Sequence, residues 1–178
     1  MIKLILLDID GVLTNGKKYY SRDAVVQLKS FCDKDWTAIK RFQALGIKII
    51  FISGDPFNEA IAKNRNLEII INRQDGKHKD KSLYLEEICT KYGVSIEEIA
   101  FVGDDIFDLE LMLKVGRQFC PSDAPRVVRE SATILECCGG DNVVMHLFDY
   151  LSAMNLIPEF VFSEHLKKVY ELDLKEKF

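Results

Sequence analysis

The chain begins with a nearly unbroken hydrophobic run, Ile2–Leu7, which only Lys3 interrupts. Such a run is typical of a strand buried on both faces of a parallel sheet. Asp8, Asp10 and Gly11 follow at its carboxyl end. Because ligands of open α/β sheets bind where the strands end, this segment predicts a functional site. Asp8 could act there as a nucleophile and Asp10 could transfer a proton, although a plain Asx turn would also fit these residues.

Strand and helix patterns alternate along the rest of the chain. Further strands are predicted at 47–52, 67–71, 99–102, 118–120 and 133–135. Helices are predicted at about 36–45, 56–66, 81–92, 109–115, 125–130 and 143–154. This alternation implies right-handed crossovers and a parallel sheet. We therefore expect a three-layer, Rossmann-like α/β fold with helices on both faces of the sheet.

Two segments depart from this alternation. Residues 17–31 contain two β-prone pieces around a polar turn at 21–23, which predicts a β-hairpin. The hairpin is rich in large apolar side chains, so we expect it to be an oligomer contact. Residues 72–80 are predicted to be a polar loop. Asp33 or Asp35 is the expected N-cap of the helix that follows the hairpin.

Length and composition are those of an ordinary globular protein. The 178 residues fit one domain, which we expect over residues 1–155, followed by a partly helical tail at 156–178. A net charge of −4 and a pI of about 5.5 argue against nucleic acid as a partner. No membrane-spanning run or signal-peptide pattern is present. The five cysteines lack a paired metal-binding spacing, which favours reduced thiols in the cytoplasm.

Polar residues follow each of the next three predicted strands. They are Ser53-Gly54 after the second strand, Lys81 after the third, and Asp104, Asp105 and Asp108 after the fourth. In a parallel sheet these residues gather at one edge with Asp8 and Asp10. Crowded carboxylates repel one another unless a cation joins them, and hard oxygen ligands with phosphate favour Mg²⁺. Ser53 can hold phosphate oxygens, and Lys81 supplies positive charge for a phosphoryl group.

The combination predicts a two-step phosphoryl transfer. Mg²⁺ and Lys81 would offset the repulsion between Asp8 and phosphate, so that an aspartyl-phosphate forms. Water, activated by Asp10 as a base, would then hydrolyse it. Each later motif has a plainer explanation when it stands alone: a loop, a surface lysine, or an acidic helix cap. Their joint order, each after its own strand, argues against coincidence.

The chain resembles the haloacid dehalogenase (HAD) superfamily of phosphotransferases over about residues 1–155. The shared motifs are Asp8-Ile9-Asp10-Gly11-Val12, Ser53-Gly54, Lys81 and Gly103-Asp104-Asp105-Ile106-Phe107-Asp108. The resemblance implies that Asp8 is the nucleophile and Asp10 the acid/base. It also implies that Asp8, the Asp10 carbonyl and Asp104 hold Mg²⁺, with Asp105 and Asp108 in support. Receiver domains use similar groups, but their acidic pair precedes the phospho-acceptor aspartate, so the order here favours the hydrolase.

The spacing leaves no room for a cap domain. Only a hairpin and a helix fit between Asp10 and Ser53, and only a helix and a strand fit between Ser53 and Lys81. A capless enzyme of this superfamily takes a macromolecular substrate or borrows a lid from a neighbouring subunit. The hairpin, the compact length and Gly139-Gly140 resemble the tetrameric 3-deoxy-D-manno-octulosonate (KDO) 8-phosphate phosphatases. Relatives in that subfamily act on 9-phosphates of nonulosonates, the sialic-type nine-carbon acids. The resemblance therefore implies a homotetramer.

Two acidic residues differ from the pattern of the octulosonate enzymes. Asp55 stands where those enzymes usually have an arginine, and Asp141 stands where they have arginine or lysine. Negative charges there should repel an anionic sugar acid, and the nonulosonate enzymes tolerate them, so a preference for a 9-phosphate is expected. Lys63 keeps a positive charge nearby and is the third expected substrate contact. Alternatively, Asp55 simply caps the next helix.

We therefore expect an Mg²⁺-dependent phosphatase for a 2-keto-3-deoxy sugar acid phosphate, in a lipopolysaccharide or sialic acid pathway. Two other functions fit the sequence. One is a protein-directed phosphatase, which a monomer with an open site would suit. The other is a non-catalytic partner of an acylneuraminate cytidylyltransferase, because this fold also occurs fused to such enzymes. Intact Asp8, Asp10 and Lys81 argue against a loss of catalysis.

Overall fold

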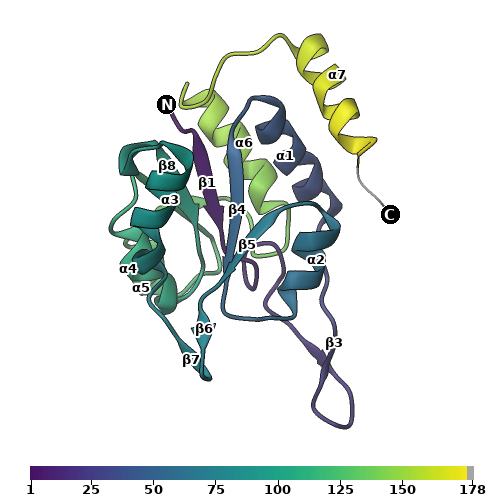
Figure 1. Ribbon diagram of the computed structural model, residues 1–178, viewed down its shortest axis with the longest axis vertical. Coiled ribbons are helices and arrows are strands. Elements are labelled where there is room, and N and C mark those ends of the chain that lie inside the picture. Colours follow the sequence, from purple (N-terminus) through teal and green to yellow (C-terminus); the bar gives the residue numbers. More distant parts are fainter. Residues whose placement is uncertain (176–178) are drawn as a thin grey trace.

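A six-stranded parallel sheet forms the centre of the protein (Figure 1). The computed structural model describes residues 1–175, and the strand order is β10-β9-β8-β1-β4-β5. The strands are β1 (Leu4–Leu7), β4 (Lys48–Ser53), β5 (Glu68–Ile71), β8 (Ile99–Val102), β9 (Arg117–Pro121) and β10 (Thr133–Leu135). The chain builds outward from β1 to β4 on one side and to β8 on the other. β1 therefore ends at the topological switch point, where such sheets bind ligands.

Helices cover both faces of this sheet, as the alternating pattern predicts (Figure 1). One face carries α1 (Asp33–Ala44), α2 (Asn58–Asn64) and α6 (Val143–Ala153). The other carries η1 (Lys81–Tyr84), α3 (Leu85–Tyr92), α4 (Leu109–Met112) and α5 (Arg126–Arg129). Two further 3₁₀ turns are η2 (Ile96–Glu98) and η3 (Ile106–Asp108). The fold is the expected three-layer α/β architecture, and residues 1–175 contain no separate cap domain.

Side chains of β1 fill both hydrophobic layers in alternation. Ile5 and Leu7 pack under α1 and α6, whereas Leu4 and Leu6 pack under α3 and α4. All four side chains are fully buried, and each contributes about 1.5–3 kcal/mol relative to exposure to water. The unbroken hydrophobic run in the sequence thus reflects a strand that is covered on both faces.

Two small hairpins project beyond the edge where the parallel strands end (Figure 1). The first pairs β2 (Tyr19–Tyr20) with β3 (Val26–Leu28), inside the segment predicted as a hairpin. The second pairs β6 (Arg73–Gln74) with β7 (Lys77–His78), so the prediction of a plain loop over residues 72–80 is wrong. Asp75 and Gly76, at φ 50° and 76°, form the two-residue turn with left-handed backbone that suits tight hairpins.

The predicted cap of α1 is also wrong. Cys32 occupies the N-cap position of α1 and makes no side-chain cap bond, whereas Asp33 and Asp35 lie in the first turn. The Asp35 carboxylate is buried and accepts a hydrogen bond of 2.8 Å from the backbone N–H of Val144. Asp35 therefore caps the start of the neighbouring helix, α6, and its hydrogen bond links α1 to α6.

The C-terminal segment folds back onto the domain. Helix α7 (Phe162–Asp173) packs against α1, and Lys40 of α1 forms an ion pair with Asp173. The ring of His165 is buried against Phe148 and Phe160. The division of the chain at residue 155 stays a prediction. Within the described part of the chain, no helix combines the length and the hydrophobicity that crossing a membrane requires.

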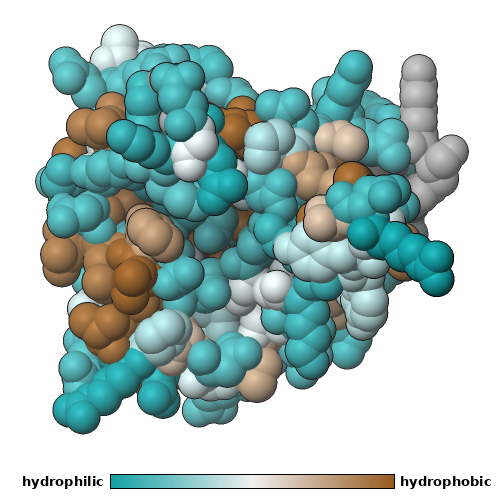
Figure 2. All heavy atoms as spheres, turned by 90° about the horizontal axis from the view of Figure 1, so that it is seen from below, coloured by the Kyte–Doolittle hydropathy of each residue, from teal (hydrophilic) through white to brown (hydrophobic). Residues whose placement is uncertain are grey.

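Figure 2 shows the molecule from the end at which the parallel strands finish. Hydrophilic residues cover most of this face, and hydrophobic residues gather at its left edge, on the side of α4 and α5. Leu113 and Val127 are among the exposed hydrophobic residues of the chain. The surface around the strand ends is therefore mainly polar.

Candidate active site

Asp8 is fixed at the end of β1 by backbone and side-chain contacts. Its N–H donates to the carbonyl of Val102 at 3.0 Å, which extends the pairing of β1 with β8. Its Oδ1 accepts a hydrogen bond of 2.7 Å from the N–H of Ile9. These bonds leave Oδ2 directed to Lys81, 3.1 Å away. The site therefore has a buried carboxylate with one oxygen held by the backbone and the other beside a cation.

Lys81 joins two carboxylates in the interior. It begins η1, where the side chain of Asp80 caps the turn through the N–H of Ser82. The Lys81 Nζ lies 2.6 Å from Asp108 Oδ1 as well as near Asp8. Burial alone would lower the pKa of Lys81, but Asp8 and Asp108 outweigh it and raise that pKa above its usual value. Lys81 is therefore a permanent positive charge in the site.

Three carboxylates form a cluster that fits a metal ion. One oxygen from each of Asp8, Asp104 and Asp108 lies within 4.8 Å of the others. The Oδ1 of Asp104 is buried and has no hydrogen-bond partner. Hard carboxylate oxygens and an orphaned acceptor are what Mg²⁺ or a similar cation would satisfy. Asp108 accepts bonds from the N–H groups of Asp104 and Asp105, so it also shapes the loop.

The electrostatics of this cluster would favour the binding of a cation. Burial, followed by the charges of Asp8 and Asp108, raises the pKa of Asp104 to about 8. Burial also raises the pKa of Asp8 to about 7, although Lys81 opposes the shift. Gly11, at φ 94°, lies so close that a Cβ there would collide with the Asp104 carboxylate. The glycine of the first motif therefore lets the loop approach the cluster.

Ser53, at the end of β4, is held in place by Asn58 and by the backbone of Asp55. The Ser53 Oγ accepts hydrogen bonds from Asn58 Nδ2 at 2.9 Å and from the N–H of Asp55 at 3.2 Å. Asn58 is completely buried at the start of α2. Ser53 is thus pre-oriented, and its hydroxyl hydrogen is available to an incoming oxygen. The sequence offered no motif that singled out Asn58.

Asp10 is held on the other side of Ser53 by a buried lysine. Lys29 Nζ lies 2.7 Å from Asp10 Oδ1, 2.8 Å from Asp55 Oδ2 and 2.8 Å from Asn58 Oδ1. Asn58 Nδ2 also donates to Asp10 at 3.1 Å. No motif in the sequence pointed to a role for Lys29. The Lys29 side chain extends from the end of the hairpin to Asp10, a contact that depends on the tertiary structure.

Asp55 is neutralised by two lysines. Its Oδ2 lies 2.6 Å from Lys18 Nζ and 2.8 Å from Lys29 Nζ, and its Oδ1 accepts from the N–H of Phe57 at 3.0 Å. Burial alone would raise the pKa of Asp55, but the hydrogen bonds from Lys18 and Lys29 hold it far below the usual range. Asp55 therefore both caps the turn before α2 and balances the two lysines.

These groups surround a cavity of about 390 Å³. It is lined by Asp8, Asp10, Lys18, Tyr20, Val26, Ser53, Gly54, Asp55, Arg73, His78, Lys81, Asp105, Phe107 and Asp108. Its size falls in the range of about 300–1,000 Å³ that small-molecule sites occupy. The side chain of Asp105 is exposed and caps the N–H of Ile106 instead of joining the cluster. The contribution of the Asp10 carbonyl to a metal site stays a prediction.

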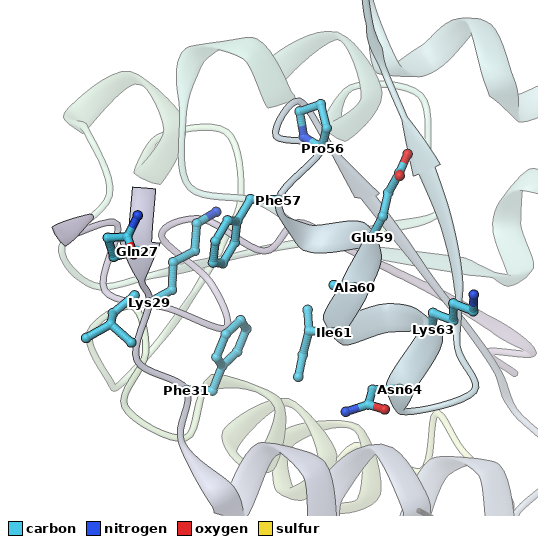
Figure 3. Close-up of a pocket in the computed structure, with 11 residues that line it drawn as sticks. Gln27, Lys29, Phe31, Pro56, Phe57, Glu59, Ala60, Ile61, Lys63 and Asn64 are labelled. Carbon is cyan, nitrogen blue, oxygen red and sulfur yellow. The ribbon is translucent and has the colours of Figure 1, made fainter. Parts of the chain in front are cut away.

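Two of the expected substrate residues lie outside this cavity. Lys63 lines a separate hollow of about 770 Å³ between β3 and α2, and Figure 3 shows its amine pointing away from Lys29 and Phe57. Asp141 is exposed and is not among the residues that line the catalytic cavity. Of the three residues that the resemblance suggested for substrate binding, only Asp55 faces the site.

Comparison with known proteins agrees with this geometry. The family model described as haloacid dehalogenase-like hydrolase matches residues 22–116. The 3-deoxy-D-manno-octulosonate 8-phosphate phosphatase KdsC of Haemophilus influenzae is 28% identical over 151 residues, which cover 84% of this chain and 82% of the relative.

Solved structures extend the similarity to the fold. A putative hydrolase of HAD subfamily III A from Legionella pneumophila superposes with a TM-score of 0.82 at 26% identity, covering 96% of this chain and 90% of the other. The 3-deoxy-D-manno-octulosonate 8-phosphate phosphatase from Moraxella catarrhalis, in complex with magnesium, phosphate and KDO, superposes with a TM-score of 0.76 at 26% identity. That match covers 86% of this chain and 88% of the other.

Proposed function

Because this chain belongs to the haloacid dehalogenase-like hydrolases, we propose that it hydrolyses the phosphomonoester of a 2-keto-3-deoxy sugar acid. The observation that carries the proposal is the buried arrangement of Asp8, Lys81 and Asp108, in which Lys81 lies 3.1 Å from the Asp8 oxygen that would attack phosphorus. The three carboxylates of Asp8, Asp104 and Asp108 would hold Mg²⁺. When bound, the ion supplies positive charge that offsets the repulsion between Asp8 and phosphate.

The residues then divide the reaction into two steps. Asp8 Oδ2 attacks phosphorus and forms the aspartyl-phosphate, while the bond from phosphorus to the sugar oxygen breaks. Asp10 donates a proton to that leaving oxygen. Asp10 next takes a proton from a water molecule, which attacks phosphorus and releases inorganic phosphate and free Asp8. Ser53 and Lys81 hold the phosphoryl oxygens throughout, and Lys29 and Asn58 keep the Asp10 carboxylate beside them.

The substrate class rests on the relatives and on the size of the cavity. Two of the compared proteins are named as phosphatases of KDO 8-phosphate, and the cavity at the strand ends suits a small molecule. KDO 8-phosphate is therefore the first candidate, and a nonulosonate 9-phosphate is the second. A homotetramer in the cytoplasm, with neighbouring subunits covering the site, is part of the same proposal.

Release of inorganic phosphate from KDO 8-phosphate in the presence of Mg²⁺ tests the proposal. We expect Asp8→Asn to abolish this release while leaving the circular dichroism spectrum unchanged. Asp33→Asn is the matched control, because Asp33 is an exposed aspartate of α1 that is not among the residues lining the cavity. Retention of more than a few per cent of activity by pure Asp8→Asn protein would remove Asp8 from the role of nucleophile.

A further inference from the structure

The hairpin β6–β7 carries two side chains into the mouth of the catalytic cavity. Arg73 and His78 both line the cavity, and they form a directly opposed pair in the hairpin. Side chains of an opposed antiparallel pair lie on the same face of the two strands. Gln74 and Lys77 form the other pair, and Lys77 is not among the residues that line the cavity. The hairpin therefore presents one face to the site.

The base of this hairpin is tied to the strand that carries Ser53. The buried Asn72 donates its N–H to the Ser53 carbonyl at 3.0 Å. Across the hairpin, the N–H of Lys79 donates to the Asn72 carbonyl at 2.7 Å, and Asn72 Nδ2 donates to the Lys79 carbonyl at 2.7 Å. Three bonds at one residue fix where the hairpin leaves the sheet. The position of Arg73, the next residue, is therefore coupled to the phosphate-binding serine.

His78 holds the hairpin against both walls of the site. Its ring stacks on Phe107 with a centroid distance of 4.9 Å and an interplanar angle of 18°. On the other wall it lies so close to Gly54 that a Cβ there would collide with the ring. Gly54 and Phe107 belong to the segments that follow β4 and β8. The hairpin thus spans the cavity mouth and is held there by a ring in contact with both segments.

Arg73 is the cation of this cavity that no carboxylate neutralises. Its Nη2 lies 2.6 Å from His78 Nε2, and among residues 1–175 no carboxylate lies within ion-pair distance of it. Lys18 pairs with Asp55, and Lys81 pairs with Asp8 and Asp108. Burial, and then the charges of Arg73 and Lys81, lower the pKa of His78. A neutral His78 ring can accept the hydrogen bond from Arg73 and orient the guanidinium.

We propose that Arg73, positioned by His78, binds the carboxylate of the substrate while the phosphate of the substrate lies between Ser53 and Lys81. A guanidinium recognises a carboxylate through two parallel hydrogen bonds. Arg73 would then select phosphomonoesters that carry an acid at the end of the molecule away from the phosphate. The inference rests on the proposed function, because it names Arg73 as the residue with which the proposed active site recognises a sugar acid.

Steady-state kinetics on two substrates test the proposal. KDO 8-phosphate carries the carboxylate, and p-nitrophenyl phosphate lacks it. We expect Arg73→Ala to lower kcat/KM for KDO 8-phosphate by about tenfold or more, through KM, and to leave kcat/KM for p-nitrophenyl phosphate within about twofold. His78→Phe keeps a ring on Phe107 and removes the acceptor, so we expect a smaller rise in KM for KDO 8-phosphate alone. Equal losses on both substrates would overturn the assignment.

Lys77→Ala is the matched control, because it removes a positive charge from the same hairpin on the face that does not line the cavity. We expect this variant to have the same kcat/KM as the unmodified protein for both substrates. A loss with Lys77→Ala as large as that with Arg73→Ala would show that general charge attraction, and not a binding contact of Arg73, explains the result, and would overturn the proposal.

A binding measurement separates this proposal from the proposed function. Calorimetric titration of KDO 8-phosphate into Asp8→Asn protein, with and without Arg73→Ala, needs no turnover. We expect the Arg73→Ala change to weaken binding by about tenfold or more. If unmodified protein releases no phosphate but this difference persists, the phosphatase function fails and the carboxylate subsite stands. If both proteins bind KDO 8-phosphate equally or not at all, the subsite fails whatever the turnover.

Discussion

Lys29 Nζ lies 2.7 Å from Asp10 Oδ1, and the Lys29 side chain is completely buried. The same amine reaches Asp55 and Asn58, so all three hydrogens of the ammonium have partners. The hairpin thereby supplies the charge that orients the proposed acid/base of the neighbouring strand end. The proposed general base, Asp10, is therefore supported from a segment that lies outside the parallel sheet.

Lys29→Met should therefore impair both steps of the proposed reaction, because Asp10 takes part in each. Without the ammonium, Asp10 and Asp55 lose their shared counter-charge, and Asn58 loses the donor to its Oδ1. We expect kcat to fall by at least about tenfold and the free energy of unfolding to fall by about 1–3 kcal/mol. Phosphate release and thermal unfolding measure the two effects. Lys34→Met, at an exposed lysine of α1, is the control, and equal activity in the two variants would contradict the role of Lys29.

Asp55→Asn should lower stability at neutral pH. Hydrogen bonds from Lys18 and Lys29 hold the pKa of Asp55 below the usual 3.8, so the folded protein favours its ionised form. The stabilisation is present above about pH 4 and is lost as the pH falls through the folded-state pKa. We expect a loss of about 1–3 kcal/mol at pH 7 that shrinks in acid. Glu59→Gln in α2 is the control, and a constant difference at all pH values would rule out the charge effect.

The two ion pairs also change the expected substrate preference. The sequence predicts that Asp55 repels the carboxylate of KDO 8-phosphate, but its charge is balanced by Lys18 and Lys29. We now expect the unmodified protein to turn over KDO 8-phosphate with a kcat/KM no lower than that for a nonulosonate 9-phosphate. Asp55→Arg should reduce activity on both, because it would place a third cation beside two lysines. A tenfold preference for the 9-phosphate in paired kinetics would instead show that Asp55 repels the carboxylate of KDO 8-phosphate.

Mg²⁺ should stabilise the protein more at alkaline than at acidic pH. The folded-state pKa of Asp104 is raised from 3.8 to about 8, so metal-free stability falls as the pH rises between these values. The ion competes with protons for the same oxygens. We expect a larger rise in Tm on adding Mg²⁺ at about pH 8.5 than at about pH 6. Asp104→Asn should remove the response and Asp33→Asn should keep it; an unchanged response in Asp104→Asn would exclude Asp104 as a ligand.

The first hairpin should form a contact between subunits. Tyr19, Tyr20, Val25 and Leu28 are each more than half exposed, at 59%, 60%, 56% and 65%. This is more apolar surface than an isolated hairpin should leave in water. We expect light scattering at micromolar concentration to show an oligomer, and Leu28→Glu to dissociate it. Leu113→Glu, at an exposed leucine just after α4, is the control. A monomeric unmodified protein would refute the contact.

Most of the fold was predictable because its signals are local. The buried strands appear as hydrophobic runs, and Gly93, in the left-handed conformation at φ 62°, ends α3 as the pattern predicts. Two local predictions were wrong for identifiable reasons. Asp75-Gly76 forms the tight turn of a hairpin, although the polar residues around it favour a loop. The sequence predicts that Asp35 caps its own helix, but its carboxylate caps α6, more than a hundred residues away in the chain.

The order of residues along the chain is enough to predict which side chains meet at the ends of the strands. Asp8, Lys81 and the aspartates after β8 each follow a strand, and parallel strands bring their ends to one edge, so order along the chain implies proximity. The folded structure was needed to show how the charges are balanced. Lys18 and Lys29 pair with Asp55, Asn58 bonds to Ser53 and Asp10, and Arg73 has no carboxylate within ion-pair distance in the described part of the chain. These partners come from two hairpins and a helix start, and no periodicity links them. An ion pair depends on distances of a few ångströms between side chains, which only the packed chain defines.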